Sequence, residues 1–160
     1  MCGIVGYVGK AEAAPILLDG LRRLEYRGYD SAGVAIVDGD HVETRKCAGR
    51  IAGLSQLLSE SPAPGHYGIS HTRWATHGAV NEQNAHPLTG CDEHKLAIVL
   101  NGIVENYREL KASLEADGHV FHTETDAEVV VHLIERHYEG DLVAAFKQAY
   151  AELEGHFSIR

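Results

Sequence analysis

The feature that most constrains the fold of this chain is the irregular order in which strand-like and helix-like segments follow one another. Short segments rich in β-branched residues predict strands at residues 3–8, 33–37, 41–47, 67–71, 95–100 and after residue 155. Apolar residues at helical spacing predict helices at residues 13–26, 51–58, 105–117, from about residue 125, and at 141–153. A doubly wound parallel sheet needs regular alternation of strands and helices, so this order favours an α+β or layered α/β architecture instead.

Two local signals predict how particular elements begin or turn. The dipeptide Asp38-Gly39 separates two strand-like segments and favours the positive backbone angles of a tight turn, which predicts an antiparallel hairpin. Thr125 and Glu128 match the Ser/Thr-x-x-Glu capping box ahead of an apolar run. That box predicts a helix start in which Asp126 lies in the first turn.

Length, charge and hydropathy exclude several classes of function. A chain of 160 residues suits one domain of ordinary size. Lys and Arg number 14 against 23 Asp and Glu, and the net charge of -9 repels polyanions, so we expect no nucleic-acid partner. No apolar run approaches the roughly 20 residues of a membrane span, and the first residues do not resemble a secretory signal. We therefore expect a cytoplasmic protein without a membrane partner.

The cysteines and histidines give little indication of a metal site. Three cysteines are widely spaced and form no Cys-x-x-Cys pair. His71, His77 and His86 could be imagined as ligands, but the sequence contains no His-x-x-x-His pair with a helical carboxylate. We expect no metal ion and no cofactor.

Cys2 occupies an unusual position for a cysteine. Removal of Met1 would leave its thiol and a free α-amine on one residue, and both groups titrate near pH 8 when unperturbed (about 8.5 and about 8). Such a residue could supply a nucleophile and a base for acyl transfer. From position alone, Cys2 could equally be an early residue of a buried strand, since free cysteine is commonly buried.

Five sequence blocks point to a known family. In chain order they are residues 2–6 (CGIVG), 25–33 (EYRGYDSAG), 71–78 (HTRWATHG), 84–87 (NAHP) and 101–106 (NGIVEN). Together they closely resemble the glutaminase domain of the glutamine:fructose-6-phosphate aminotransferases, a type 2 glutamine amidotransferase. The resemblance implies an N-terminal-nucleophile hydrolase fold, a four-layer α/β/β/α sandwich with antiparallel sheets.

The resemblance also implies how the reaction would run. Cys2 would attack the side-chain amide of glutamine, and the oxyanion of the tetrahedral intermediate would need preorganised hydrogen-bond donors. The Asn101 side chain and the Gly102 N–H match the family's oxyanion hole. Taken alone, Asn101-Gly102 is more typical of a type I′ hairpin turn.

Recognition of free glutamine requires a cation for its α-carboxylate and an anion for its α-ammonium group. Arg73 and Asp126 match the family's positions for these two roles, although a carboxylate near a helix start is also favoured by the helix dipole. The resemblance further implies glutamine-binding or bracing roles for Trp74, Thr76, His77 and Arg27.

The family's domain is longer than this chain, so the resemblance implies that residues 1–160 are an incomplete glutaminase domain, truncated on its C-terminal side. In the family it is followed by sugar isomerase domains, absent here, which pass ammonia to fructose-6-phosphate in an enzyme expected to be a homodimer or larger. Two alternatives stay open: an inactive fragment that retains glutamine binding, and a glutaminase serving another acceptor such as phosphoribosyl pyrophosphate.

Overall fold

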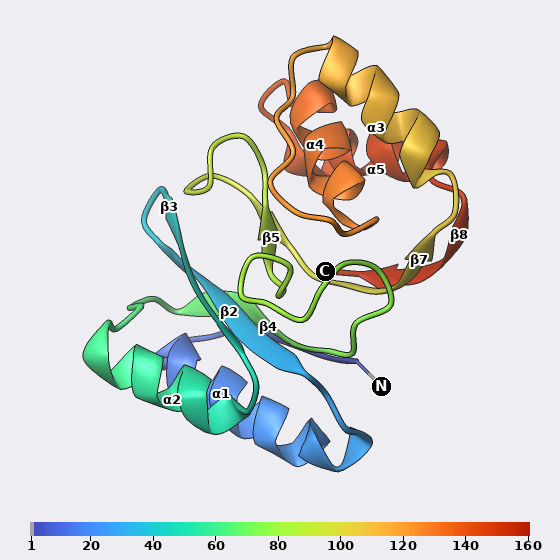
Figure 1. The fold of residues 1–160 in the computed structure, drawn as a ribbon. Coiled ribbons are helices and arrows are strands. Elements are labelled where there is room, and N and C mark those ends of the chain that lie inside the picture. The colour runs from blue at the N-terminus through green and yellow to red at the C-terminus, as the bar shows by residue number, and fades with distance from the viewer. Residues whose placement is uncertain (1) are drawn as a thin grey trace.

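The structure, a computed structural model, describes residues 2–160 as layers of antiparallel strands and helices (Figure 1). The strands are β1 (Gly3–Val8), β2 (Ser31–Asp38), β3 (His41–Ala48), β4 (Tyr67–Arg73), β5 (Leu88–Thr89), β6 (Ala97–Ile98), β7 (Leu100–Val104) and β8 (Gly155–Ile159). The helices are α1 (Ala13–Leu24), α2 (Ile51–Glu60), α3 (Tyr107–Ala116), α4 (Glu128–His137) and α5 (Leu142–Glu152), and a 3₁₀ turn, η1 (Glu25–Arg27), follows α1.

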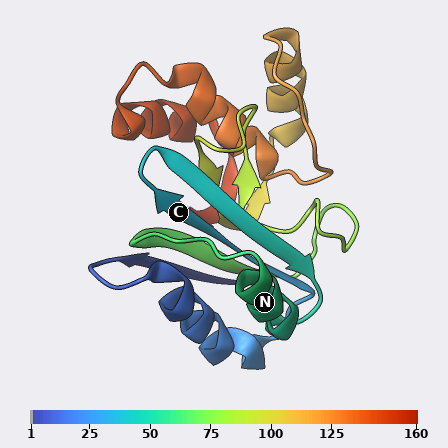
Figure 2. The same cartoon turned by 90° about the vertical axis from the view of Figure 1, so that its left-hand side faces the viewer.

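The first sheet has the strand order β1-β4-β2-β3, and every neighbouring pair is antiparallel. Helices α1 and α2 cover one face of this sheet (Figure 2). The apolar sides of the helices and strands form a buried core there, because each element must bury its hydrophobic face against another. Its members include Leu17, Leu21, Val34, Ile36 and Leu54.

The second layer of strands is formed by β7 and β8, with the short β5-β6 pair beside them. Backbone hydrogen bonds between Val99 and Arg160, of 2.9 and 3.0 Å, continue the pairing past β7 and β8. Helices α3, α4 and α5 lie on the side of these strands away from the first sheet (Figure 1). A second core fills this half of the molecule and includes Val104, Leu114, Val130, Leu133 and Ala145.

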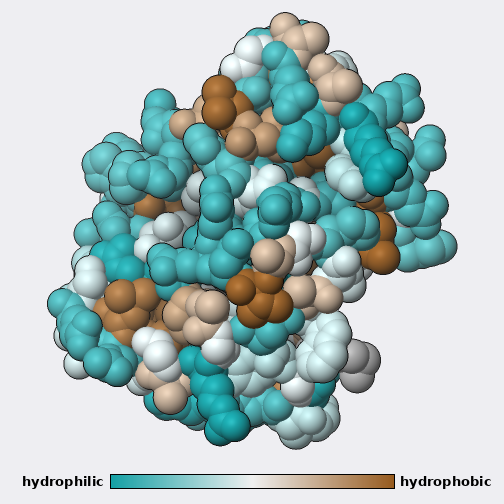
Figure 3. Space-filling view, in the orientation of Figure 1, coloured by the Kyte–Doolittle hydropathy of each residue, from teal (hydrophilic) through white to brown (hydrophobic). Residues whose placement is uncertain are grey.

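The two halves stack as helices, sheet, sheet and helices, which both views of the ribbon show (Figures 1 and 2). The predicted α+β class, and the four-layer arrangement of N-terminal-nucleophile hydrolases, are thereby confirmed. The face of the molecule in Figure 3 is mostly hydrophilic, and its hydrophobic patches are small and separated.

The predicted hairpin forms, but its turn lies one residue further along the chain. Asp38 pairs with His41, so the two-residue loop is Gly39-Asp40 and not Asp38-Gly39. Gly39 has φ of 58°, the left-handed conformation that glycine adopts most readily. The strands set this register because one face of the ribbon packs on the core, and a shift of one residue would expose it.

The predicted capping box is wrong. Helix α4 begins at Glu128 itself, and no side chain caps its N-terminus. The Glu128 carboxylate accepts hydrogen bonds from the backbone N–H groups of His122 (2.7 Å) and Thr123 (2.8 Å), so it ties down the segment before the helix. Asp126 consequently precedes α4 and is not in its first turn.

Candidate active site

A pocket of about 220 Å³ lies between the two sheets. This volume is below the roughly 300–1,000 Å³ of pockets for drug-sized ligands and suits a molecule the size of an amino acid. Strand ends from both halves of the fold and the long connection after β4 meet there. The lining residues are Cys2, His71, Arg73, Trp74, Thr76, His77, His86, Leu100, Gly102, Ile103, Thr125, Asp126 and Ala127.

Cys2 lies immediately before β1, and the antiparallel pairing of β1 with β4 brings it beside the residue that follows β4. Its sulfur accepts a hydrogen bond from the backbone N–H of Trp74 at 3.2 Å. The thiol is free and only partly buried, so it faces the pocket rather than a closed core. The predicted removal of Met1 concerns a residue outside the described range.

Arg73 and Asp126 are the buried cation and anion of the pocket, each with about 4% of its surface exposed. The Arg73 guanidinium donates to the backbone carbonyls of His77 and Ala79, the latter at 3.3 Å. Burial lowers the pKa of Arg73, yet a guanidinium stays protonated in proteins. The Asp126 carboxylate accepts from the backbone N–H of Val104 at 2.7 Å, which fixes it against β7.

The connection from Trp74 to His77 covers one side of the pocket. Trp74 is 54% exposed, so it is not the core aromatic that its residue type would suggest. His77 Nδ1 lies 3.5 Å from Asp126 Oδ1, and its ring meets Tyr107 edge-on at 5.6 Å between centroids. Asp30, which precedes β2 in the first half of the fold, also holds this connection: its carboxylate accepts a hydrogen bond from the backbone N–H of Ala75 at 2.6 Å.

Gly102 lines the pocket, and no other residue type fits its position without displacement. Its φ is 126°, and a Cβ there would lie 2.1 Å from the carbonyl oxygen of His156 and 2.6 Å from the Cα of Phe157. Gly102 pairs with Phe157 inside the β7-β8 ladder. The type I′ turn that Asn101-Gly102 favours in isolation is therefore not formed, since long-range pairing with β8 overrides the local preference.

Asn101 is not among the lining residues, but a lining residue orients its side chain. His71 Nε2 lies 2.7 Å from Asn101 Oδ1. An amide oxygen only accepts, so His71 donates, and the assigned orientation leaves the Asn101 NH₂ group free as a donor. Burial lowers the pKa of His71 to about 4, so the ring is neutral at pH 7 and carries a single proton for this bond.

Of the predicted site residues, Cys2, Arg73, Trp74, Thr76, His77, Gly102 and Asp126 meet at the pocket. Arg27 does not line it and lies in η1.

His71, His86 and Asp30 were not predicted to have a role in catalysis or glutamine binding, although each lies in a block that resembles the family; the two histidines were weighed only as possible metal ligands. Among residues 2–160, neither ring nitrogen of the buried His86 has a hydrogen-bond partner, and the ring centroid lies 4.5 Å from that of His71. Burial holds the pKa of His86 well below its usual range. Asp30 anchors the covering connection. No periodicity or spacing distinguishes such residues from ordinary core positions.

Hydrogen bonds between the loops that contain Asn84 and Glu124 hold the segment that follows His77. Asn84, which is 1% exposed, donates to the Glu124 carboxylate at 2.9 Å and accepts from the Glu124 backbone N–H at 2.9 Å. Glu124 also accepts from the backbone N–H of Ala79 at 2.9 Å.

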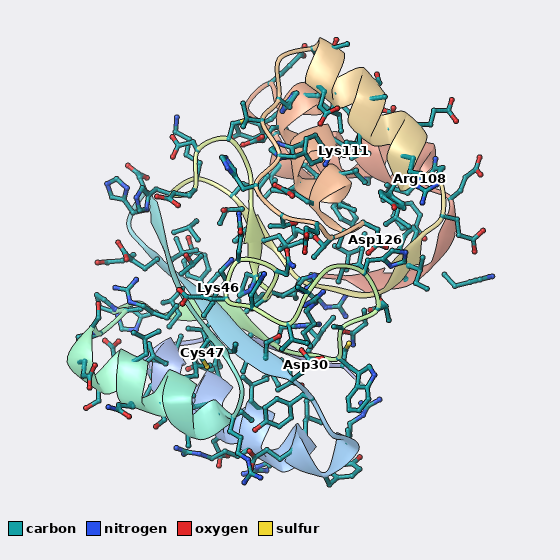
Figure 4. All side chains as sticks on the ribbon, viewed as in Figure 1. Asp30, Lys46, Cys47, Arg108, Lys111 and Asp126 are labelled. Carbon is teal, nitrogen blue, oxygen red and sulfur yellow. The ribbon has the colours of Figure 1, made fainter. Side chains whose placement is uncertain are left out.

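Figure 4 labels Asp30 and Asp126, which hold the site from the two halves of the fold.

Within residues 2–160, no helix combines the length and the apolar character that crossing a bilayer requires.

Comparison of the sequence with protein families matches residues 71–160 to the glutamine amidotransferase domain. The chain is also similar to curated proteins named glutamine--fructose-6-phosphate aminotransferase [isomerizing]. It is 52% identical to that of Clostridium tetani and 54% identical to that of Symbiobacterium thermophilum, each over 159 residues. Each match covers 99% of this chain but 26% of the relative, so the chain spans about a quarter of these proteins.

Two solved structures have the same fold. The glutamine phosphoribosylpyrophosphate amidotransferase from B. subtilis, complexed with ADP and GMP, matches with a TM-score of 0.84 and 32% identity over 99% of this chain and 34% of that one. A structure described as the allosteric regulatory enzyme of purine biosynthesis matches with a TM-score of 0.85, 32% identity and the same coverage. The family match over residues 71–160 spans more than half of the chain, and the chain belongs to the glutamine amidotransferase domain family.

Proposed function

We propose that residues 1–160 form part of a type 2 glutamine amidotransferase domain that releases ammonia from the side-chain amide of glutamine through Cys2. One observation carries the proposal: the Cys2 thiol shares a pocket of amino-acid size with a buried arginine and a buried aspartate. A thiol nucleophile, a cation and an anion are the three groups that cleavage of a free amino acid's side-chain amide requires.

The reaction proceeds in two steps. After Met1 is removed, the α-amine of Cys2 takes the thiol proton, and the sulfur attacks the side-chain carbonyl carbon of glutamine to form a C–S bond. The Gly102 N–H and the Asn101 NH₂ group stabilise the resulting oxyanion, each donor contributing a few kcal/mol. The amine returns the proton to the leaving nitrogen, ammonia departs, and water hydrolyses the thioester to glutamate.

Substrate selection follows from the charges in the pocket. Arg73 binds the α-carboxylate of glutamine and Asp126 binds its α-ammonium group, with His77 beside Asp126 at 3.5 Å. Trp74 and Thr76 close the pocket over the substrate, and Arg27 braces the chain that leads to Asp30. Each charged group would be expensive to bury without an opposite charge, which favours a zwitterionic ligand.

The destination of the ammonia depends on the rest of the protein. We propose fructose-6-phosphate as acceptor, bound by sugar isomerase domains beyond this chain in a cytoplasmic enzyme that is a homodimer or larger. The names of relatives about 50% identical support this acceptor. Phosphoribosyl pyrophosphate is the second candidate, because a protein named for it shares the fold at 32% identity.

The proposal for Cys2 is tested on the purified 160-residue chain by intact mass and by glutamate release from glutamine. We expect a mass lacking Met1 and measurable hydrolysis. Cys2→Ser should abolish glutamate release, whereas Cys47→Ser should not change it, because Cys47 lies on β3 outside the pocket. Retention of Met1 with no hydrolysis would leave the inactive-fragment alternative as the correct one. Supplying each acceptor to the longer gene product then separates the two acceptors.

A further inference from the structure

A cluster of four metal-ligating side chains lies away from the Cys2 pocket. It consists of Cys91 in the connection between β5 and β6, His119 after α3, and His132 and Glu135 on α4. Their ligand atoms all lie within 4.8 Å of one another, and none of the four residues lines the Cys2 pocket. His132 and Glu135 are three residues apart on one helix, a spacing that places both side chains on the same face.

For five of the six pairs of ligand atoms a distance is known: four fall in the range expected around a tetrahedral ion, and the fifth, between His132 and Glu135, is shorter at 3.0 Å. Cys91 Sγ lies 3.5 Å from His119 Nδ1 and 3.6 Å from His132 Nδ1, and the two Nδ1 atoms are 3.3 Å apart. Glu135 Oε2 lies 3.5 Å from His119 Nδ1 and 3.0 Å from His132 Nδ1. Zinc bonds of about 2.0–2.3 Å at tetrahedral angles separate neighbouring ligand atoms by about 3.3–3.8 Å.

The surroundings of the cluster place a buried carboxylate beside one of its histidines. His132 is fully buried, and its other ring nitrogen, Nε2, lies 3.5 Å from the buried Glu128 carboxylate. A carboxylate behind a histidine is the usual support of a histidine that binds metal through its other nitrogen. At Gly90 a Cβ would lie 1.9 Å from Glu135 Oε1, so the chain before Cys91 passes close to this side chain, and a larger residue there would displace the Glu135 carboxylate.

The simpler interpretation is a hydrogen-bonded network in which a protonated His132 bridges Glu128 and Glu135. That network accounts for His132 and the two carboxylates. It does not account for Cys91 Sγ and His119 Nδ1, which also converge on His132 Nδ1 and on each other. The single proton on His132 Nδ1 can point to only one of its three neighbours, whereas one cation at the centre of the cluster would contact all four ligand atoms.

We propose that Cys91, His119, His132 and Glu135 bind one Zn²⁺ ion in a structural site. Four protein ligands close the tetrahedron, and a mixed thiolate, imidazole and carboxylate set suits zinc. The ion would join the β5-β6 connection to α4 and to the segment that leads from α3 toward Asp126. The expectation that no metal is bound rested on His71, His77 and His86, which belong to the Cys2 pocket and its surroundings.

The test uses zinc alone on the purified 160-residue chain, after removal of bound metal with a chelator. We expect one Zn²⁺ per chain by elemental analysis after re-addition and desalting, and a higher melting temperature with zinc than with chelator. Cys91→Ser and His119→Gln should each weaken zinc binding by at least about 100-fold. Removing a residue that only hydrogen-bonds a metal ligand already costs up to about 100-fold in affinity, and removing the ligand itself should cost at least as much. Both side chains have surface exposure, so their replacement should leave the fold intact by circular dichroism.

Replacing zinc with cobalt tests whether Cys91 is the thiolate ligand. The chain has three cysteines, so a Cys2→Ser, Cys47→Ser double variant keeps Cys91 as its single thiol. This variant should give the intense tetrahedral absorption and the thiolate-to-cobalt charge-transfer band, and adding Cys91→Ser should remove the charge-transfer band. Absence of stoichiometric zinc in the parent chain, or zinc affinity unchanged in Cys91→Ser and His119→Gln, would overturn the proposal. Neither readout depends on glutaminase activity.

Discussion

At the scale of single residues, the site depends on neutral histidines buried beside a buried cation. His71 donates to Asn101 Oδ1 and lies against His86, and both rings have a lowered pKa because burial disfavours their charged forms. A protonated His71 could still donate through Nε2, but it would place a second positive charge in the buried region that already holds Arg73, with Asp30 as a partial counter-charge. Protonation of His71 is therefore unfavourable in the folded chain, although its hydrogen bond to Asn101 could persist.

His71 should make the chain less stable in mild acid. Its pKa is about 4 when folded and 6.5 when unperturbed, so the unfolded chain takes up the proton first as the pH falls. The contribution of His71 to the free energy of unfolding is fully present above about pH 6.5 and is lost as the pH falls to about 4, a loss of roughly 3 kcal/mol. The lowered pKa of His86 acts in the same direction. Urea unfolding at about pH 7 and about pH 5 measures the loss.

Two variants separate this residue from the other histidines. His71→Gln keeps a donor for Asn101 but does not titrate, so its stability should depend less steeply on pH. His66→Gln changes an exposed histidine and should retain the parent slope. An unchanged slope in His71→Gln would contradict the assignment.

Several site residues could be named from the sequence because they belong to blocks that resemble a family, and the structure brings most of them to one pocket. The supporting residues lie in the same blocks, but the sequence did not indicate what they contact. His71, His86 and Asn84 are buried polar residues, and their partners Asn101, His71 and Glu124 lie 30, 15 and 40 positions away. The proposed zinc ligands have the same property, since the set spans residues 91 to 135 and contains only one short spacing.

At the scale of elements, helix positions followed from apolar periodicity, whereas turns did not follow from turn residues. Strand β1 and helices α2 and α3 lie within about two residues of their predicted bounds, which is the precision expected of such boundaries. Asn101-Gly102 has the composition of a turn but lies inside a strand, because β8, more than 50 residues further on, supplies a partner for β7.

Gly102 provides a test of that strand pairing. Gly102→Ala should destabilise the chain by roughly 3 kcal/mol or more, because its φ of 126° is strained for alanine and its Cβ would meet the β8 backbone at 2.1 Å. Gly140→Ala is the matched control, since Gly140 has φ of 103° but no neighbouring atom within 4 Å of a Cβ. It should cost only about 1–2 kcal/mol. Equal losses in urea unfolding would contradict the crowding at Gly102.

At the scale of the whole molecule, the pocket joins two halves that have separate hydrophobic cores. Cys2 and Arg73 belong to the first half of the fold, where Cys2 precedes β1 and Arg73 ends β4. Gly102 and Asp126 belong to the second half. A ligand held by residues of both halves should therefore stabilise the entire chain, and not only one half.

Glutamine should raise the melting temperature of the Cys2→Ser chain, which binds it without turnover. At 100 times the dissociation constant the stabilisation is about 2.7 kcal/mol, or roughly 5–10 °C for a chain of this size. Asp126→Asn keeps an acceptor for the Val104 N–H but removes the charge for the α-ammonium group, so most of the shift should disappear. A full shift in Asp126→Asn would mean that Asp126 does not bind the substrate.

The antiparallel pairing of β1 with β4 also bears on how the chain is synthesised. Gly3 pairs with Thr72, so the first strand to leave the ribosome waits for nearly 70 further residues before its partner exists. At about 5–20 residues per second, that wait lasts roughly 3–14 s. During translation the N-terminal end is therefore unpaired, so the proposed removal of Met1 would come before the sheet closes around Cys2. If the proposal holds, the nucleophile would mature before the site that uses it is assembled.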